Sequence, residues 1–342
     1  MVKTIFTLLV LVSAGLAQIY SDGPFSVHHS QDVDFFLNAA KMQEVETLDS
    51  AVAASARSAV PSAPVSLPSI KKEVQEVNVT FTATDHHGHF VRNLAPSDFT
   101  IHDNGEPSER ITYFESQSEL PLRLAIVIDS SDSVGYAFND EKRSAGVFLK
   151  RILRRNSDLA LVMEFNQGVR LVQELASDND LLSHAIQNLR SGGGETAIYD
   201  AVSAASQELA KVKDTQPARR AIILITDGEE NSSHINLGQA AEVAQRNECA
   251  VYVMRINLAG RNLEQSDRAM KELAEVTGGN FLDVRTKEDV TIAFSKIDKE
   301  LRSQYLISYK PATVSPDGSF HRIVVLGPKN LRIHHRDGYF AR

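Results

Sequence analysis

Three short stretches of this 342-residue sequence carry clustered oxygen-bearing side chains. They are Asp129-Ser130-Ser131-Asp132-Ser133 after the apolar run Leu122 to Ile128, Gly192-Gly193-Gly194-Glu195-Thr196 before a helical pattern, and Thr226-Asp227-Gly228 after the apolar run Ala221 to Ile225. Carboxylate and hydroxyl oxygens are the ligands that hard divalent cations prefer. An oxygen-only cluster at the end of a buried strand therefore predicts a hard-cation site.

The elements that must position these stretches are strands alternating with helices. Apolar runs occur at Leu122 to Ile128, Leu159 to Phe165, Ala221 to Ile225 and Ala250 to Ile256, with amphipathic helical patterns between them. This alternation predicts an α/β fold with a doubly wound, Rossmann-like, mostly parallel sheet covered by helices on both faces. Val169 to Leu175 follows Phe165 across a short turn, so it is expected to pair back as one antiparallel edge strand.

In a doubly wound sheet, the loops after neighbouring strands meet where the strand order reverses. Five oxygen-bearing side chains from three loops would meet there: Asp129, Ser131, Ser133, Thr196 and Asp227. A small divalent ion takes about six oxygens, keeps some water, and can exchange one water for a carboxylate of a partner. Mg²⁺ is the expected ion, with Mn²⁺ as an able substitute. Helix capping is the alternative interpretation, but it explains one loop and not all three.

The three stretches, in this order, resemble the metal-ion-dependent adhesion site of von Willebrand factor type A domains, integrin I domains included. The resemblance covers roughly Leu122 to Ser303. It implies that the three hydroxyl side chains contact the ion and that the two aspartates act directly or through water. Asp132 stands where the family commonly has glycine. A turn with positive φ is the preferred interpretation of Asp132, and contact with a second cation is the alternative.

Strand patterns of period two flank the α/β unit on both sides. Val77 to Thr84 precedes the unit, and Gln304 to Lys310, His321 to Leu326 and Leu331 to His335 follow it. Neither flank has enough strands to close a sandwich alone. We therefore expect residues 71–117 and 304–342 to form one β-sandwich-like domain, interrupted by a type A domain at residues 118–303.

The flanks resemble those of bacterial secreted VWFA-related domain proteins, a family common in acidobacteria. The residues that carry this second resemblance are Val79 to Phe81, Asp85, Gly88, Leu94, Asp98-Phe99, Asp103-Asn104-Gly105, Gln304-Tyr305-Leu306 and Gly338-Tyr339-Phe340. The resemblance extends to nearly the whole mature chain, and it implies no defined substrate.

The first residues have the pattern of a secretory signal. Lys3 supplies the positive start, Ile5 to Val12 the apolar stretch, and Gly15-Leu16-Ala17 the cleavage site, so residues 1–17 are expected to be removed. Residues 18–70 are predicted to be a flexible or partly disordered linker. The apolar run is shorter than the ~20 residues of a spanning helix, so no transmembrane anchor is expected after cleavage. The single cysteine, Cys249, excludes an internal disulfide, and export without disulfides favours a bacterial secreted, periplasmic or cell-envelope protein.

Composition and motifs together predict a binding module. The net charge of −8 argues against nucleic acid as a partner. The expected function is non-enzymatic, cation-dependent binding of a protein ligand that presents Asp or Glu. A metal-dependent hydrolase or phosphatase is one alternative, with His234 as its only nearby base, and an envelope-assembly scaffold with a structural ion is another. The ligand's identity and the oligomeric state are left open.

Overall fold

A computed structural model of the protein describes residues 76–116, 120–131, 138–214, 218–258, 260, 263–313 and 317–341. The predicted signal peptide and linker lie outside the described residues. So do the predicted ligand Ser133 and its neighbour Asp132.

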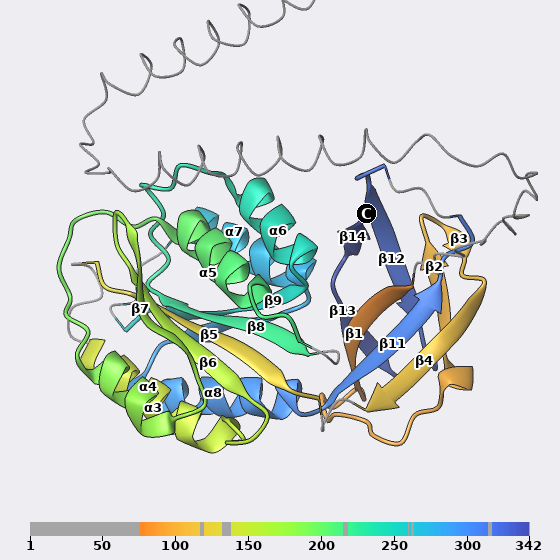
Figure 1. Cartoon of the computed structure of the whole chain (residues 1–342), viewed down its shortest axis with the longest axis horizontal. Coiled ribbons are helices and arrows are strands. Elements are labelled where there is room, and N and C mark those ends of the chain that lie inside the picture. The colour runs from red at the N-terminus through yellow and green to blue at the C-terminus, as the bar shows by residue number, and fades with distance from the viewer. Residues whose placement is uncertain are drawn as a thin grey trace, which may run out of the picture. The chain divides into compact units, whose positions relative to one another are not determined.

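A six-stranded sheet forms the centre of the α/β unit (Figure 1). In spatial order its strands are β10 (Phe281–Val284), β9 (Cys249–Ile256), β8 (Arg219–Thr226), β5 (Leu122–Asp129), β6 (Leu159–Phe165) and β7 (Val169–Ala176). All neighbouring pairs are parallel except β6 and β7, which confirms the predicted antiparallel edge strand. The chain runs from β5 out to β7 and then crosses to β8 on the other side of β5. The strand order therefore reverses between β5 and β8.

Three helices cover each face of this sheet (Figure 1). One layer comprises α3 (Phe138–Ile152), α4 (Asn179–Gln187) and α8 (Lys287–Leu301), and the other α5 (Ile198–Ala210), α6 (Leu237–Arg246) and α7 (Glu264–Thr277). Successive side chains of a strand point to opposite faces. Accordingly, Leu124, Ile126 and Ile128 pack in the first layer, whereas Ala125 and Val127 pack in the second. The doubly wound prediction is confirmed.

Two four-stranded antiparallel sheets form a second domain, called the β-domain below (Figure 1). One sheet is β13 (Arg332–His335), β1 (Val77–Thr84), β11 (Gln304–Lys310) and β4 (Arg110–Ser116), and the other is β14 (Gly338–Phe340), β12 (Phe320–Leu326), β2 (Thr100–Asp103) and β3 (Glu106–Pro107). β1 pairs with β11, and β2 pairs with β12, so each sheet joins strands from both flanks of the α/β unit. An apolar core that includes Val79, Phe81 and Ile307 lies in this domain.

A buried carboxylate ties the strands of the β-domain together. Asp103, at the end of β2, accepts hydrogen bonds from the hydroxyls of Tyr309 at 2.8 Å and Tyr339 at 2.9 Å, and His321 Nδ1 lies 2.8 Å from its other oxygen. Burial and the Asp103 charge raise the pKa of both tyrosines. One side chain thus links β2 to β11, β12 and β14.

Substitution of Asp103 by alanine should destabilise the β-domain because it leaves the buried Tyr309 and His321 and the half-buried Tyr339 without their shared partner. We expect the free energy of unfolding, measured by urea titration, to fall by about 3 kcal/mol. Tyr339→Phe removes one donor and should cost about 1 kcal/mol. Equal stability of Asp103→Ala and the wild type would contradict the role assigned to this carboxylate.

Candidate metal centre

Two aspartates lie where the strand order of the sheet reverses. Asp129 is the last residue of β5, and Asp227 directly follows β8. The two strands are in parallel register through Ile128 and Ile225, so their carboxyl ends reach the same edge. The Thr226 hydroxyl donates to Asp129 Oδ2 over 2.6 Å. The sequence-predicted meeting of these two loops is therefore present at the strand ends themselves.

Asp129 is fully buried but its carboxylate is held by donors. Besides the Thr226 hydroxyl, the backbone N–H of Ser131 donates to its Oδ1 at 2.9 Å. Burial, together with the nearby charge of Asp227, raises the pKa of Asp129 to about 6 against the effect of these bonds. A cation beside the two aspartates would oppose both effects and favour the ionised carboxylates.

Hydrogen bonds of its backbone hold the third loop against the other two, in one case to a side-chain acceptor. The N–H of Gly192 donates to Ser130 O at 2.8 Å, which joins the loop before α5 to the loop after β5. The N–H of Thr196 donates to Asn231 Oδ1 at 2.8 Å, and the N–H of Asn231 donates to Thr196 O at 3.1 Å. With the bond from Thr226 to Asp129, these contacts close a ring of three loops.

The loop after β8 also caps helix α5. Ala197, at the N-cap of this helix, offers no side-chain acceptor. Instead, Glu230 Oε2 accepts from the N–H of Ile198 at 2.6 Å, and Ser233 Oγ accepts from the N–H of Tyr199 at 3.0 Å. Capping of otherwise unsatisfied N–H groups stabilises a helix terminus. The cap fixes the first turn of α5 directly after Thr196.

Glu141 of α3 is a carboxyl group that sequence reasoning missed. Its side chain is fully buried, and neither of its carboxylate oxygens has a hydrogen-bond partner among the described residues. Burial, followed by the charges of Asp129 and Asp227, raises the pKa of Glu141 to about 8. A signal was available in the sequence, because Glu141 lies at helical spacing with Ala145 and Phe148 on the apolar face of α3.

Four of the five predicted ligands lie in the described part of the chain, and all four are buried: Asp129, Ser131, Thr196 and Asp227. Their loops meet at one edge of the sheet, whereas Ser133 lies outside the described residues. Within the described ranges, no three His, Cys, Asp or Glu side chains are grouped so as to hold an ion. A cation would therefore need hydroxyl oxygens and water beside the two aspartates. That donor set fits Mg²⁺ or Mn²⁺, and the five-residue ligand set stays a prediction.

Removal of the Asn231 side chain should weaken ion binding although Asn231 is not a predicted ligand. Asn231→Ala deletes the acceptor that holds the Thr196 backbone, and loss of such supporting contacts typically lowers metal affinity by about 10–100-fold. Isothermal titration calorimetry with MgCl₂ and MnCl₂ would measure the change. Asn188→Ala, at the exposed end of α4, is the matched control and should bind as the wild type does. Unchanged affinity in Asn231→Ala would contradict the ring of loops.

Glu141 should make the metal-free protein less stable at alkaline pH. Its folded pKa of about 8 exceeds the ordinary value of 4.5, so the folded state holds the proton more tightly. The contribution of Glu141 to the free energy of unfolding is then fully present below its ordinary pKa of 4.5, and it is lost as the pH rises to about 8. Relative to Glu141→Gln, the wild type in EDTA should lose about 3 kcal/mol of unfolding free energy between pH 5 and pH 8 in urea titrations.

The exposed Glu272→Gln variant controls for the loss of a negative charge. It should follow the pH dependence of the wild type. If Glu141→Gln also follows it, Glu141 does not titrate in the way its burial indicates.

Comparison with solved structures finds many similar folds at low sequence identity. A von Willebrand factor type A protein from Catenulispora acidiphila is 14% identical, with 80% of this chain and 75% of that chain covered and a TM-score of 0.46. An aerotolerance-related membrane protein from Bacteroides fragilis is 17% identical over 53% of this chain and 98% of that one, with a TM-score of 0.44. Proximal thread matrix protein 1 from the mussel byssus, with a zinc-occupied MIDAS motif, is 16% identical over 58% and 49%, with a TM-score of 0.47.

None of the curated proteins matches the sequence. The family model of the von Willebrand factor type A domain matches residues 124–296, which is just over half of the chain. Domains of this type are commonly metal-dependent adhesion or protein-binding modules. The matched segment runs from β5 into α8 and contains the three loops that meet at the two aspartates. The chain therefore belongs to the von Willebrand factor type A domain family.

Proposed function

We propose that this protein is an extracytoplasmic, cation-dependent protein-binding module whose ion accepts an acidic side chain of a partner. The observation that carries the proposal is the buried set of oxygen donors, Asp129, Ser131, Thr196 and Asp227, at one edge of the sheet. Mg²⁺, or Mn²⁺ in its place, is the proposed ion. When bound, it would supply a Lewis-acid position for a carboxylate oxygen.

The chemistry of the donors supports a carboxylate as the incoming group. Ser131 and Thr196 offer neutral hydroxyls, so within this donor set only the two aspartates carry charge. An ion with few anionic ligands keeps its attraction for a further carboxylate and exchanges a water for it. The described part of the chain orients the donors through the ring of loops and keeps Asp129 out of solvent.

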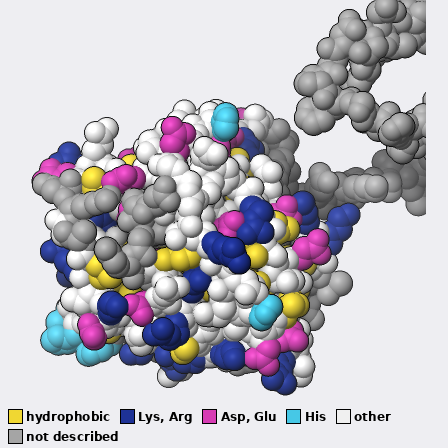
Figure 2. Space-filling model, turned by 90° about the vertical axis from the view of Figure 1, so that its left-hand side faces the viewer, with side chains coloured by type: hydrophobic (Ala, Val, Ile, Leu, Met, Phe, Trp, Pro, Cys, Tyr) yellow, Lys and Arg dark blue, Asp and Glu magenta, His cyan; other side chains and the backbone are white. Residues whose placement is uncertain are grey.

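On the face that carries the strand ends, the described side chains that are visible include both signs of charge (Figure 2). Figure 2 views the side of the molecule that lies to the left in Figure 1, where basic and acidic side chains are interspersed with hydrophobic ones on the coloured surface. Electrostatic steering by a single-sign surface is therefore not supported there. The proposed contact depends instead on the ion and on a directional carboxylate.

The location outside the cytoplasm rests on the secretory pattern at the N-terminus. Among the described residues, no helix combines the length and the hydropathy needed to span a membrane.

Cys249 is buried, and burial raises the pKa of its thiol to about 12, so the thiol is kept in its unreactive protonated form.

Hydrolysis is the alternative that one contact favours. His234 Nδ1 lies 2.8 Å from Asp200 Oδ2, an arrangement that orients an imidazole in many hydrolases. However, Asp200 also accepts hydrogen bonds from the backbone N–H groups of His234 and Ile235. The histidine ring is 86% exposed. We interpret the pair as a tie between α5 and the loop after β8, and we propose that the protein is not an enzyme. Phosphoesterase activity that is lost in His234→Ala would reverse this ranking.

Partner capture from cell-envelope extract should require the ion and the aspartate. Immobilised wild-type protein is expected to retain a partner in MgCl₂ and to release it in EDTA, because the ion forms the contact. Asp129→Ala should retain none, whereas Asp180→Ala, an exposed aspartate of α4, should behave as the wild type. Amidation of carboxyl groups in the extract with carbodiimide should abolish capture.

Two other results would change the interpretation. Capture that survives both EDTA and Asp129→Ala would contradict an ion-mediated contact. If Thr196→Ala lowers the melting temperature in Mg²⁺ but leaves capture intact, the ion is structural and the protein is an envelope-assembly scaffold.

A further inference from the structure

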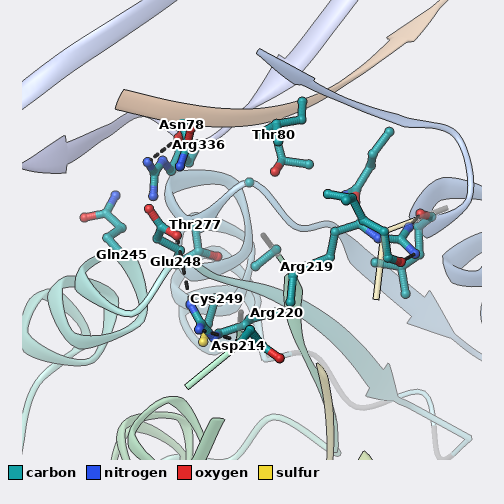
Figure 3. A pocket seen from close by; sticks show the side chains of 17 residues that line it. Asn78, Thr80, Asp214, Arg219, Arg220, Gln245, Glu248, Cys249, Thr277 and Arg336 are labelled. Carbon is teal, nitrogen blue, oxygen red and sulfur yellow. Dashed lines mark hydrogen bonds and ion pairs between the residues drawn. The ribbon is translucent and has the colours of Figure 1, made fainter. Parts of the chain in front are cut away.

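A second polar site lies at the opposite end of the α/β sheet. A cavity of about 360 Å³ is lined by the first residues of β8 and β9 and by β1 and β11 of the β-domain (Figure 3). Arg219 and Arg220 begin β8, whereas Asp227 follows the last residue of the same strand. An eight-residue strand is about 25 Å long, so this cavity is separate from the metal centre.

Arg219 is a buried cation with incomplete hydrogen bonding. Its side chain is 5% exposed, and its terminal nitrogens donate to the backbone oxygens of Leu301 and Leu120. Its Nε is buried without a hydrogen-bond partner, and no carboxylate of the described residues forms an ion pair with it. Burial, and then the neighbouring charge of Arg302, lower its pKa to about 10. The charge of Asp158 opposes this lowering, although no direct ion pair joins the two described side chains. A buried guanidinium without a direct ion-pair partner is unfavourable, so this group favours a bound anion.

The rest of the lining leaves an excess of positive charge. Arg220 reaches Asp214 at 3.8 Å and Glu248 at 4.0 Å, and its own Nε is also buried without a hydrogen-bond partner. Asp214 is more tightly engaged with Arg123, at 2.5 Å. Arg336 lies on the β-domain side of the cavity and donates to the backbone of that domain (Figure 3). The lining thus carries three guanidinium groups and two carboxylates, and the carboxylate of Asp214 is already paired with Arg123 outside the lining.

We propose that this cavity binds a small molecule bearing an oxyanion, with its carboxylate or phosphate group on Arg219 and Arg220. Guanidinium groups match the geometry of both oxyanions and form strong charge-assisted hydrogen bonds with them. The volume is within the range of small-molecule sites. Thr80 and Gln245 add neutral polar groups to the lining, and Leu306 adds an apolar one, so the cavity suits a small polar organic anion.

Calorimetric titration of the full chain would test the proposal with two probes, inorganic phosphate and citrate. Buffers contain EDTA, so that no divalent ion contributes, and NaCl titrations of equal ionic strength provide the baseline. At least one probe should bind the wild type. In Arg219→Gln and in Arg220→Gln the dissociation constant should rise about tenfold or more. Arg322→Gln, on the exposed side of β12, and Asp129→Ala should bind as the wild type does.

The probe that binds identifies phosphate or carboxylate as the recognised group. If circular dichroism shows that Arg219→Gln does not fold, Arg220→Gln decides the question, since among the described residues its side chain makes only two long ion pairs. If neither probe binds, water fills the cavity in place of an anion and the proposal is wrong. Wild-type affinity in the folded arginine variants would also overturn it. Asp129→Ala is expected to leave anion binding unchanged. Failure of this proposal is therefore independent of the proposed function.

Discussion

The hydrogen bond from the Thr226 hydroxyl to Asp129 Oδ2, 2.6 Å long and fully buried, is the contact on which the metal centre depends. It joins the ends of the two strands between which the strand order reverses. The carboxylate is thereby oriented within the protein rather than towards solvent. The third loop then joins this pair through a backbone hydrogen bond from Gly192 to Ser130 and through two hydrogen bonds between Thr196 and Asn231, one of which goes to the Asn231 side chain. Because these contacts form within the protein itself, the donors are held before any ion arrives, which lowers the cost of binding one.

Charge is distributed unevenly along the α/β sheet. At the carboxyl edge, the charge of Asp227 contributes to the raised pKa of Asp129, and the charges of both aspartates contribute to the raised pKa of Glu141. At the opposite edge, Arg219 and Arg220 line a cavity with an excess of guanidinium groups. Buried groups of like charge destabilise a fold unless a counter-charge is present. Both ends of the sheet therefore favour ligands, a cation at one end and an oxyanion at the other.

The fold class was predictable because the sequence patterns that indicate it are local. The apolar runs predicted β5, β6, β8 and β9, and the short turn after Phe165 predicted the antiparallel strand β7. Period-two patterns before and after the α/β unit predicted a β-domain from both flanks, as the pairing of β1 with β11 shows. The short strands β3 and β14 were not predicted, since two or three residues are too few to show a period.

Site residues that stand at the end of an apolar strand could be predicted from the sequence. Residues whose role depends on tertiary contacts could not. Asp129 and Asp227 follow apolar runs, so their convergence could be inferred from topology. The roles of Asn231 and Glu230 could not, because their partners lie 35 and 32 residues away in the chain. Arg219 could not be predicted as a site residue either, because its cavity is formed where the β-domain packs beside the start of β8.

The most direct test of the central claim is an anomalous difference map from crystals of the protein grown with MnCl₂. We expect one strong peak per chain, bonded to hydroxyl oxygens of Ser131, Ser133 and Thr196 and adjacent to Asp129 and Asp227. No peak at the carboxyl edge of the sheet, or a peak coordinated by other side chains, would contradict it.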